Sequence, residues 1–481
     1  MPLRAWIRKW CRPAAYLANN KVTQAGAVIT TSSAITLLLF WCFGILFGSN
    51  VNPYLGVLLF LILPGVFVFG LLLMPTGAIW RRRKLAQSGA IAESYPQLDF
   101  TKEHLRSTLA WVVGLTVLNV MIFGMASYRG VEYMDSAKFC GQTCHTVMQP
   151  EFTAYENSPH QRVACVQCHI GPGADWFVRS KLSGVRQVFA VTFHTYDRPI
   201  PSPVEQLRPA RETCEQCHWP QMFTADKLIV RTHYKEDQDN TALTTVLLLR
   251  IGGGAMHGGV GIHGKHLADA SRVQYIAIDR ERQVIPEVIY TDDAGNKVKF
   301  LSAAKTSPAK LAAGEIRTMD CVDCHNRPTH VFQLPEGAVD EALSRGRISA
   351  DLPFIKKMAV AALQANYSDR STATQRIAAR LDDFYRASYP DVYRQKRKLL
   401  DAAVDQVQAI YLRNVFPAMN VTWGTYPNNL GHVNSPGCFR CHDGNHTSAD
   451  GRTIPNDCDT CHQLLAVDEV NPKLLADLGM K

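Results

Sequence analysis

The sequence predicts a mainly α fold, in which three transmembrane helices precede an exported domain that contains a small β element. Three observations support this prediction. Long uncharged stretches occur before Arg129, twelve of the 14 cysteines form six pairs that are each followed by histidine, and apolar residues alternate between 226 and 316. The net charge of +9 arises partly from basic residues that flank the uncharged stretches. This placement indicates membrane topology and no nucleic-acid partner.

The first uncharged stretch predicts a helical hairpin across a bilayer over residues 27–74. No charged residue occurs between Lys21 and Arg81, and two apolar runs, 27–48 and 55–74, flank a turn-like segment at 49–53. Each run has about the 20 apolar residues that one span needs. A cleaved signal peptide is the alternative for the first run, but the run is long and a second span follows directly.

A third span is expected at 108–128, and the basic flanks set the orientation. The N-terminal segment 1–26 and the loop 75–107 both carry clustered Arg and Lys residues, which favour the cytoplasmic side. With three spans, everything after Arg129 lies outside the membrane. The lipid bilayer is therefore an expected partner of the chain.

The six cysteine pairs predict six covalent haem c groups. The pairs, each with its histidine, are Cys140/Cys144 with His145, Cys165/Cys168 with His169, Cys214/Cys217 with His218, Cys321/Cys324 with His325, Cys438/Cys441 with His442, and Cys458/Cys461 with His462. In such a motif the two thiols hold the haem and the histidine reaches the iron. Zinc sites or disulfides are the alternatives, but zinc does not require histidine directly after every second cysteine.

The first motif differs because three residues, not two, separate Cys140 from Cys144. A bulged loop would be needed for haem to bind there. Haem c is attached on the outer side of the bacterial inner membrane, which agrees with the predicted topology. The sequence therefore predicts an inner-membrane protein with a cytoplasmic N-terminus and a periplasmic haem domain.

Each low-spin haem needs a second axial ligand, and several histidines outside the motifs are candidates. Some lie close to motifs, and others lie in the glycine-rich stretch 252–266, where backbone can approach a porphyrin. The candidates are His160, His194, His263, His266, His330, His432 and His446. Met148, three residues after His145, is either a ligand of the first haem or a packing residue.

The exported part is expected to consist of five segments. Residues 129–225 hold three motifs, which is too dense for an ordinary apolar core, so porphyrins would fill much of it. A β-containing insert follows at 226–316, a fourth haem segment at 317–335, a helical segment at 336–415 and a two-haem segment at 416–481.

The segments 134–151, 158–173 and 195–199, together with Cys214-Glu215-Gln216-Cys217-His218, resemble the NapC/NirT family of quinol dehydrogenases. The likeness covers about residues 108–225. The extra N-terminal spans and C-terminal motifs are similar to those of larger inner-membrane cytochromes of metal-reducing bacteria.

The resemblance implies a quinol dehydrogenase that takes electrons from the membrane quinone pool and passes them to periplasmic cytochromes or reductases. It implies Met148 beside the first haem and Lys181 as the residue that holds the quinol. Gln187 and Val188 stand where some members have an acidic residue, so Asp175 or Glu151 is the expected substitute.

Two other functions remain open at this point. A terminal reductase would need a haem with an open iron position. A non-catalytic relay would take electrons from another membrane subunit, with the hairpin at 27–74 as its docking element. A further membrane subunit or a second copy of the chain is therefore also a candidate partner.

Overall fold

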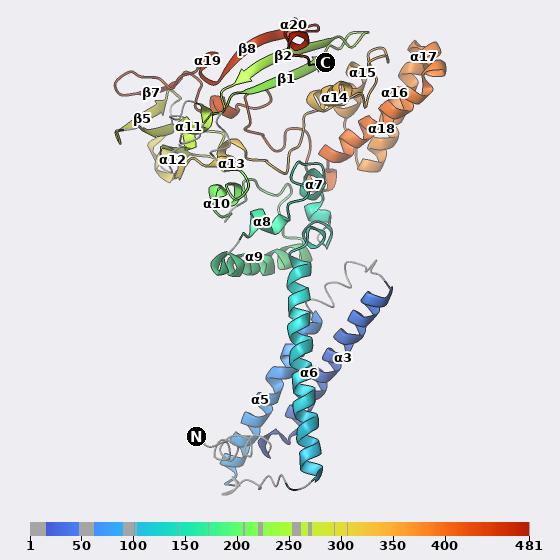
Figure 1. The fold of residues 1–481 in the computed structure, drawn as a ribbon, viewed down its shortest axis with the longest axis vertical. Coiled ribbons are helices and arrows are strands. Elements are labelled where there is room, and N and C mark those ends of the chain that lie inside the picture. The colour runs from blue at the N-terminus through green and yellow to red at the C-terminus, as the bar shows by residue number, and fades with distance from the viewer. Residues whose placement is uncertain are drawn as a thin grey trace. The chain divides into compact units, whose positions relative to one another are not determined.

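The structure is a computed structural model that describes residues 16–47, 62–89, 101, 103–143, 145–171, 173–204, 207–219, 225–252, 261–267, 272–292, 294–304 and 306–480. Helices predominate over strands in this part of the chain. The chain divides into two compact units, Met1–Thr143 and Cys144–Lys481, and each is described by itself (Figure 1).

Three long helices form the first unit. They are α3 (Lys21–Phe47), α5 (Leu63–Gln87) and α6 (Glu103–Met134), and each packs against the other two. The expected helices at 27–48 and 108–128 are present. The second helix differs, because α5 continues to Gln87 and includes the basic residues 81–84 that were expected in a loop. The predicted turn at 49–53 lies outside the described residues.

Two helices in the described part of the chain are long and apolar enough to cross a membrane. They are Lys21–Leu39, with 33% of its apolar window buried, and Leu63–Gln87, with 17% buried. Such exposure distinguishes them from core helices of a soluble protein. The third predicted span does not meet this test, although α6 is helical, and several α6 side chains lie outside the described residues.

Small residues allow α3 and α5 to pack closely. A Cβ added at Gly26 would lie 2.8 Å from the carbonyl oxygen of Gly70, and one added at Gly70 would meet Thr30. The hydroxyl of Thr23 also donates a hydrogen bond of 3.0 Å to the carbonyl of Met74. Small residues and interhelical hydrogen bonds are the usual means by which helices associate in lipid.

Antiparallel strands in the second unit form two sheets, more than the small β element that was expected. The first sheet has the order β1-β2-β8, from Lys227–Tyr234, Ala242–Leu249 and His462–Glu469. The second has the order β6-β3-β4-β5-β7, from Glu315–Thr318, Val273–Ala277, Glu287–Thr291, Lys297–Ser302 and His446–Ser448. Figure 1 shows β8 alongside β2, and β7 pairs with β5, so the C-terminal segment completes both sheets.

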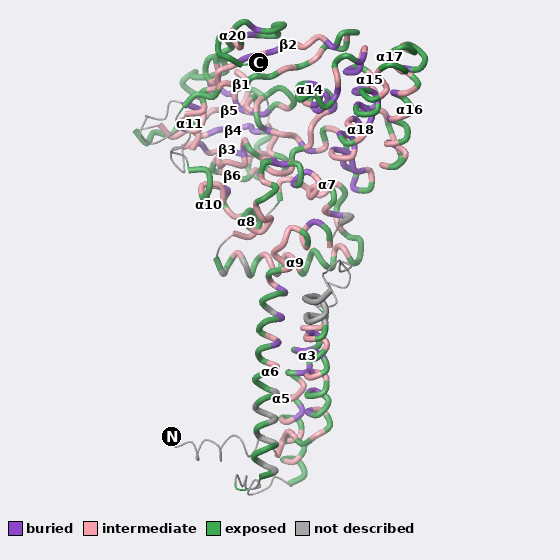
Figure 2. Tube along the Cα trace, turned by 45° about the vertical axis from the view of Figure 1, so that its right-hand side comes forward, coloured by how far each residue is buried: buried purple, intermediate pink, exposed green. Residues whose placement is uncertain are grey.

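A helical module contains the largest apolar core of the described residues. It consists of α14 (Pro335–Ser344), α15 (Ile355–Leu363), α16 (Arg370–Ser388), α17 (Pro390–Gln395) and α18 (Arg397–Asn414). Leu363, Ile377, Leu381 and Leu400 are fully buried in it, and Figure 2 shows buried stretches in purple along α14, α15 and α18. The module matches the predicted helical segment 336–415 and carries no cysteine.

Short helices hold the cysteine motifs instead. They are α8 (Cys165–His169), α10 (Ala210–Cys214), α13 (Cys321–Cys324), η7 (Gly437–Arg440) and α19 (Cys458–Cys461). A turn of this length brings two cysteines three positions apart to the same side. The remaining helices of the unit are α7 (His145–Glu156), α9 (Ala174–Thr192), α11 (Ile262–Leu267), α12 (Pro308–Ala313), η6 (Pro417–Met419) and α20 (Lys473–Asp477).

Candidate functional site

Five motif histidines each lie beside a second histidine within the described residues. The ring centres are 6.1 Å apart for His169 and His330, 5.9 Å for His218 and His160, 6.5 Å for His325 and His263, 5.7 Å for His442 and His266, and 6.1 Å for His462 and His432. Each pair combines a histidine that follows two cysteines with one of the seven candidates from the sequence.

This spacing fits one iron between the two rings. A metal–nitrogen bond of about 2.0 Å on each side, with roughly 1.1 Å from each nitrogen to its ring centre, gives a separation of about 6 Å. Rings in direct stacking contact would be closer, as His432 is to Phe439 at 4.2 Å. The five pairs therefore have the dimensions of bis-histidine haem ligation.

Hydrogen bonds orient several of these rings. In His266, Nδ1 lies 2.7 Å from the carbonyl oxygen of Ile262. In His442 it lies 2.6 Å from the carbonyl oxygen of Pro455, and in His330 it lies 2.9 Å from that of Glu151. A carbonyl only accepts, so Nδ1 carries the proton and Nε2 is left for a metal.

Burial favours the neutral form of five paired histidines, and ligation requires a neutral imidazole. Burial lowers the pKa of His266 and of His169 below the usual value, and neighbouring His442 and His330 add to the effect. The pKa values of His263, His325 and His330 are lowered for the same main reason. At these five histidines burial therefore favours the neutral form, which is the form that binds iron.

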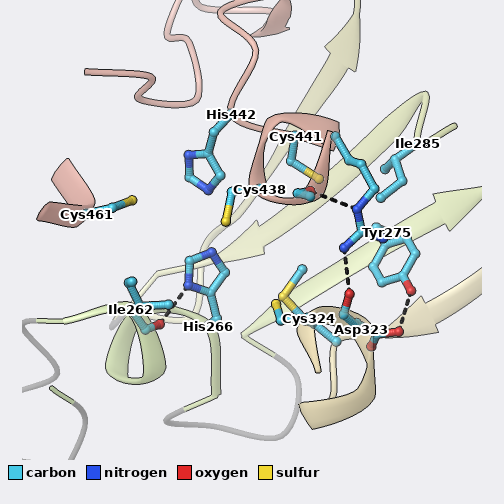
Figure 3. Close-up of a pocket in the computed structure, with 13 residues that line it drawn as sticks. Ile262, His266, Tyr275, Ile285, Asp323, Cys324, Cys438, Cys441, His442 and Cys461 are labelled. Carbon is cyan, nitrogen blue, oxygen red and sulfur yellow. Dashed lines mark hydrogen bonds between the residues drawn. The ribbon is translucent and has the colours of Figure 1, made fainter. Parts of the chain in front are cut away.

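A cavity lies at the fifth motif, with His266 and His442 among its lining residues. Figure 3 shows the rings of His442 and His266 facing one another across it, with Cys438 and Cys441 at its side. Cys324 and Cys461, from the fourth and sixth motifs, also line this cavity. Thiols of three motifs therefore meet at one space.

Motifs that are consecutive in the sequence are also neighbours in space. Helix α10 of the third motif contacts both α8 of the second and α13 of the fourth. Cys324, Cys438 and Cys461, from the fourth, fifth and sixth motifs, line one cavity. The second to sixth motifs thus form one connected row.

The first motif is described in part. Residues Phe139–Thr143 form a π-helical turn, which accommodates one residue more than an α turn. The turn lies within the motif that has the extra residue. Cys144 and the side chain of His145 lie outside the described residues. Met148 on α7 and Lys181 on α9 are both half-buried.

Two of the candidate ligands lie elsewhere. His446 is buried, and its two nitrogens bond to Asp443 Oδ1 at 2.9 Å and to the carbonyl of Ile285 at 2.8 Å. Both nitrogens are used, so we assign it a structural role in place of the expected axial one. His194 is exposed and lies beside Tyr196, with ring centres 6.3 Å apart.

An ion pair beside His330 was not identified from the sequence. The Arg327 guanidinium donates to both carboxylate oxygens of Glu151 at 3.0 Å, and the same carboxylate lies 3.3 Å from Nδ1 of His330. Glu151 is therefore engaged in positioning a histidine, which does not suit the proton-accepting role considered for it. Asp175, the other substitute, is exposed in the first turn of α9.

Histidine pairs beside cysteine motifs define a multihaem c-type cytochrome. Residues 102–201 match the N-terminal region of the NapC/NirT cytochrome c family. The chain is 42% identical over 451 residues to the cytochrome c-type protein ImcH of Geobacter sulfurreducens, covering 93% of this chain and 88% of that protein. It is 26% identical over 110 residues to the cytochrome c-type protein NrfH of Wolinella succinogenes, covering 22% and 62%.

The chain belongs to the NapC/NirT family of c-type cytochromes. This membership implies covalent haem c, and the histidine pairs fit that group. No solved structure matches the chain.

Proposed function

We propose that this protein is a hexahaem cytochrome of the bacterial inner membrane that oxidises quinol and passes the electrons to periplasmic cytochromes or reductases. The observation that carries the proposal is the set of five histidine pairs, each of which joins the histidine of one motif to a histidine outside the motifs. Family membership supports an oxidoreductase role for this row.

The paired histidines and the motif cysteines would have different roles. The paired histidines would hold each iron on both sides, and the thiols of the motifs would fix the porphyrins at defined positions. Haem c, once attached, supplies a carrier of single electrons at each pair. With both axial positions taken, five of the six irons offer no open site, which disfavours a terminal reductase at those positions.

Quinol is expected to bind near the first haem at the membrane surface. Lys181 would orient the quinol hydroxyl or accept its proton, and Met148 would lie on the side of the first haem. The first motif, with its π turn, would differ from the five paired sites in its ligands. Protons would be released on the periplasmic side.

The proposal includes a topology. Clustered basic residues lie near one end of each of the two candidate spans, and they favour the cytoplasm. A cytoplasmic N-terminus and a periplasmic haem domain would then require the chain to cross the membrane once more before the haem domain. The periplasm is the compartment in which haem c is attached and in which soluble electron acceptors would be met.

Reduction kinetics of a Lys181→Ala variant test the proposal. We expect slower reduction of the haems by a water-soluble quinol analogue and an unchanged rate with dithionite, because dithionite needs no quinol site. Lys297→Ala, which removes an exposed lysine of β5, is the matched control and should behave as the unmodified protein. Equal rates with the analogue in all three proteins would refute the assignment of Lys181.

Two further measurements separate the other functions. A non-catalytic relay would fail to oxidise quinol as an isolated protein, although dithionite would still reduce it. A terminal reductase would show a high-spin haem signal together with substrate turnover. Either result would contradict the proposed function.

A further inference from the structure

Helix α9 exposes an apolar face that nothing in the described structure covers. Val178, Leu182, Val185, Phe189 and Phe193 are each between 55 and 68% exposed. Their spacing of four, three, four and four residues places them along one side of the helix. The rings of Phe189 and Phe193 are also stacked, with centres 6.3 Å apart. Such a continuous row differs from singly scattered surface residues.

The opposite side of α9 contacts other parts of the second unit. Val191 packs against the cluster formed by Val147, Phe416 and their neighbours. Trp176 is half-buried and carries the guanidinium of Arg179 at 5.2 Å from its ring centre. The apolar row is therefore the outer side of a helix whose other side packs against the second unit at Val191, while Gln187 on that side is exposed.

Charge placement indicates what covers the row. Arg179 and Arg186 flank it on one edge and Lys181 on the other, as the 100° rotation per residue requires. No Asp or Glu occurs from Trp176 to Tyr196. Basic residues at the edges of an apolar helix face match the anionic head groups above the acyl chains of a bilayer. Three cations within one helix also argue against a spanning orientation.

We propose that α9 lies in the plane of the membrane surface, with its apolar row immersed in the acyl region of an anionic phospholipid bilayer and its three basic residues at the head groups. A bilayer is always available to this chain, since α3 and α5 have the length and composition of spanning helices. The proposal concerns lipid contact and stands whether or not quinol is the electron donor.

Fluorescence quenching tests the placement in the full-length, haem-loaded protein. Cys11 and Cys42, the two cysteines outside the six motifs, are replaced by serine. A single new cysteine is then introduced, either by Leu182→Cys in the row or by Gln187→Cys. Gln187 is exposed on the opposite side of the same helix and is the matched control. Each variant is labelled with a small fluorophore and placed in phosphatidylethanolamine–phosphatidylglycerol vesicles, with nitroxide lipids or iodide as quenchers.

We expect the label at 182 to be quenched by nitroxide lipid and to be roughly tenfold less accessible to iodide than the label at 187, because the row lies below the head groups. Equal iodide access at both positions would overturn the proposal. Shielding of 182 from both quenchers would also overturn it, since protein would then cover the row. An unchanged haem absorption spectrum shows that the variants are folded.

Vesicles of phosphatidylcholine test the role of charge. Without anionic head groups the three basic residues lose their attraction, so iodide should reach the label at 182 more readily. If access is the same in both lipid compositions, the assignment to anionic lipid is wrong.

Discussion

Single histidines differ in what their nitrogens contact, and this decides their roles. His432 is exposed and faces the ring of His462, whereas His446 is buried with both nitrogens hydrogen-bonded. Both were candidates for axial ligation on their distance from a motif. The structure separates them because a ligand needs one nitrogen left for iron.

Substitution of these two histidines should give opposite results. In His432→Ala the last haem loses its proposed second ligand, so one haem should become high-spin, as seen by electron paramagnetic resonance. In His446→Ala all haems should stay low-spin, while stability falls by about 1–3 kcal/mol because the buried groups lose their partners. A fully low-spin His432→Ala protein would show that His432 is not a ligand.

At the scale of elements, the helical module α14–α18 is stabilised differently from the motif segments. Its core consists of apolar side chains that are fully buried without any cofactor. The motif helices of four or five residues have few buried side chains of their own. The module therefore has an independent source of stability.

Leu381→Ala should lower the free energy of local unfolding of this module by about 2–5 kcal/mol, because it leaves a cavity in a packed core. Faster hydrogen exchange in α16 and α18 would report the loss. The reduction potentials of the haems should not change. Gln375→Ala, on the exposed side of α16, is the control and should leave exchange unchanged. A shift in the potentials would show that the module is coupled to the haems.

The sequence predicted the helices better than it predicted the strands and their pairing. Apolar runs and charge patterns located the helices α3, α6 and α14–α18, because these depend on local periodicity. The sheets were underestimated, since β7 and β8 come from the segment 416–481, where only two haem motifs and no strands were expected. Their pairing with β5 and β2 joins residues far apart in the chain, which periodicity does not report.

In the candidate site, too, local motifs were predictable from the sequence and long-range partners were not. The cysteine motifs could be found from spacing, and five of the seven histidines proposed as ligands lie in the pairs. Partners could not be predicted, because the proposed ligands cross between motifs. His330 follows the fourth motif but faces His169 of the second, and His160 precedes the second motif but faces His218 of the third. Only the folded chain brings these residues together.

For the whole molecule, the row of motifs predicts a single path for electrons from the second motif to the sixth. Cys438→Ala with Cys441→Ala should interrupt it, so that quinol reduces the last haem much more slowly than the earlier ones. Stopped-flow absorbance of the variant would measure this. The spectrum of the remaining haems should be unchanged if the fold is retained.

The control variant removes the sixth haem site, at the end of the row, instead of the fifth. Cys458→Ala with Cys461→Ala should leave reduction of all earlier haems at the rate of the unmodified protein. Equal reduction of the last haem with and without the fifth site would contradict a single path and indicate a branch.

Helix α11 limits which insertions the sequence can accept between His263 and His266. His263 and His266 lie on one short turn and face the fourth and fifth motifs. One inserted residue between them would rotate the second histidine by about 100° around the helix and remove it from its partner. Natural relatives that keep both pairs should therefore vary the identity of residues 264 and 265 but never the length of this interval.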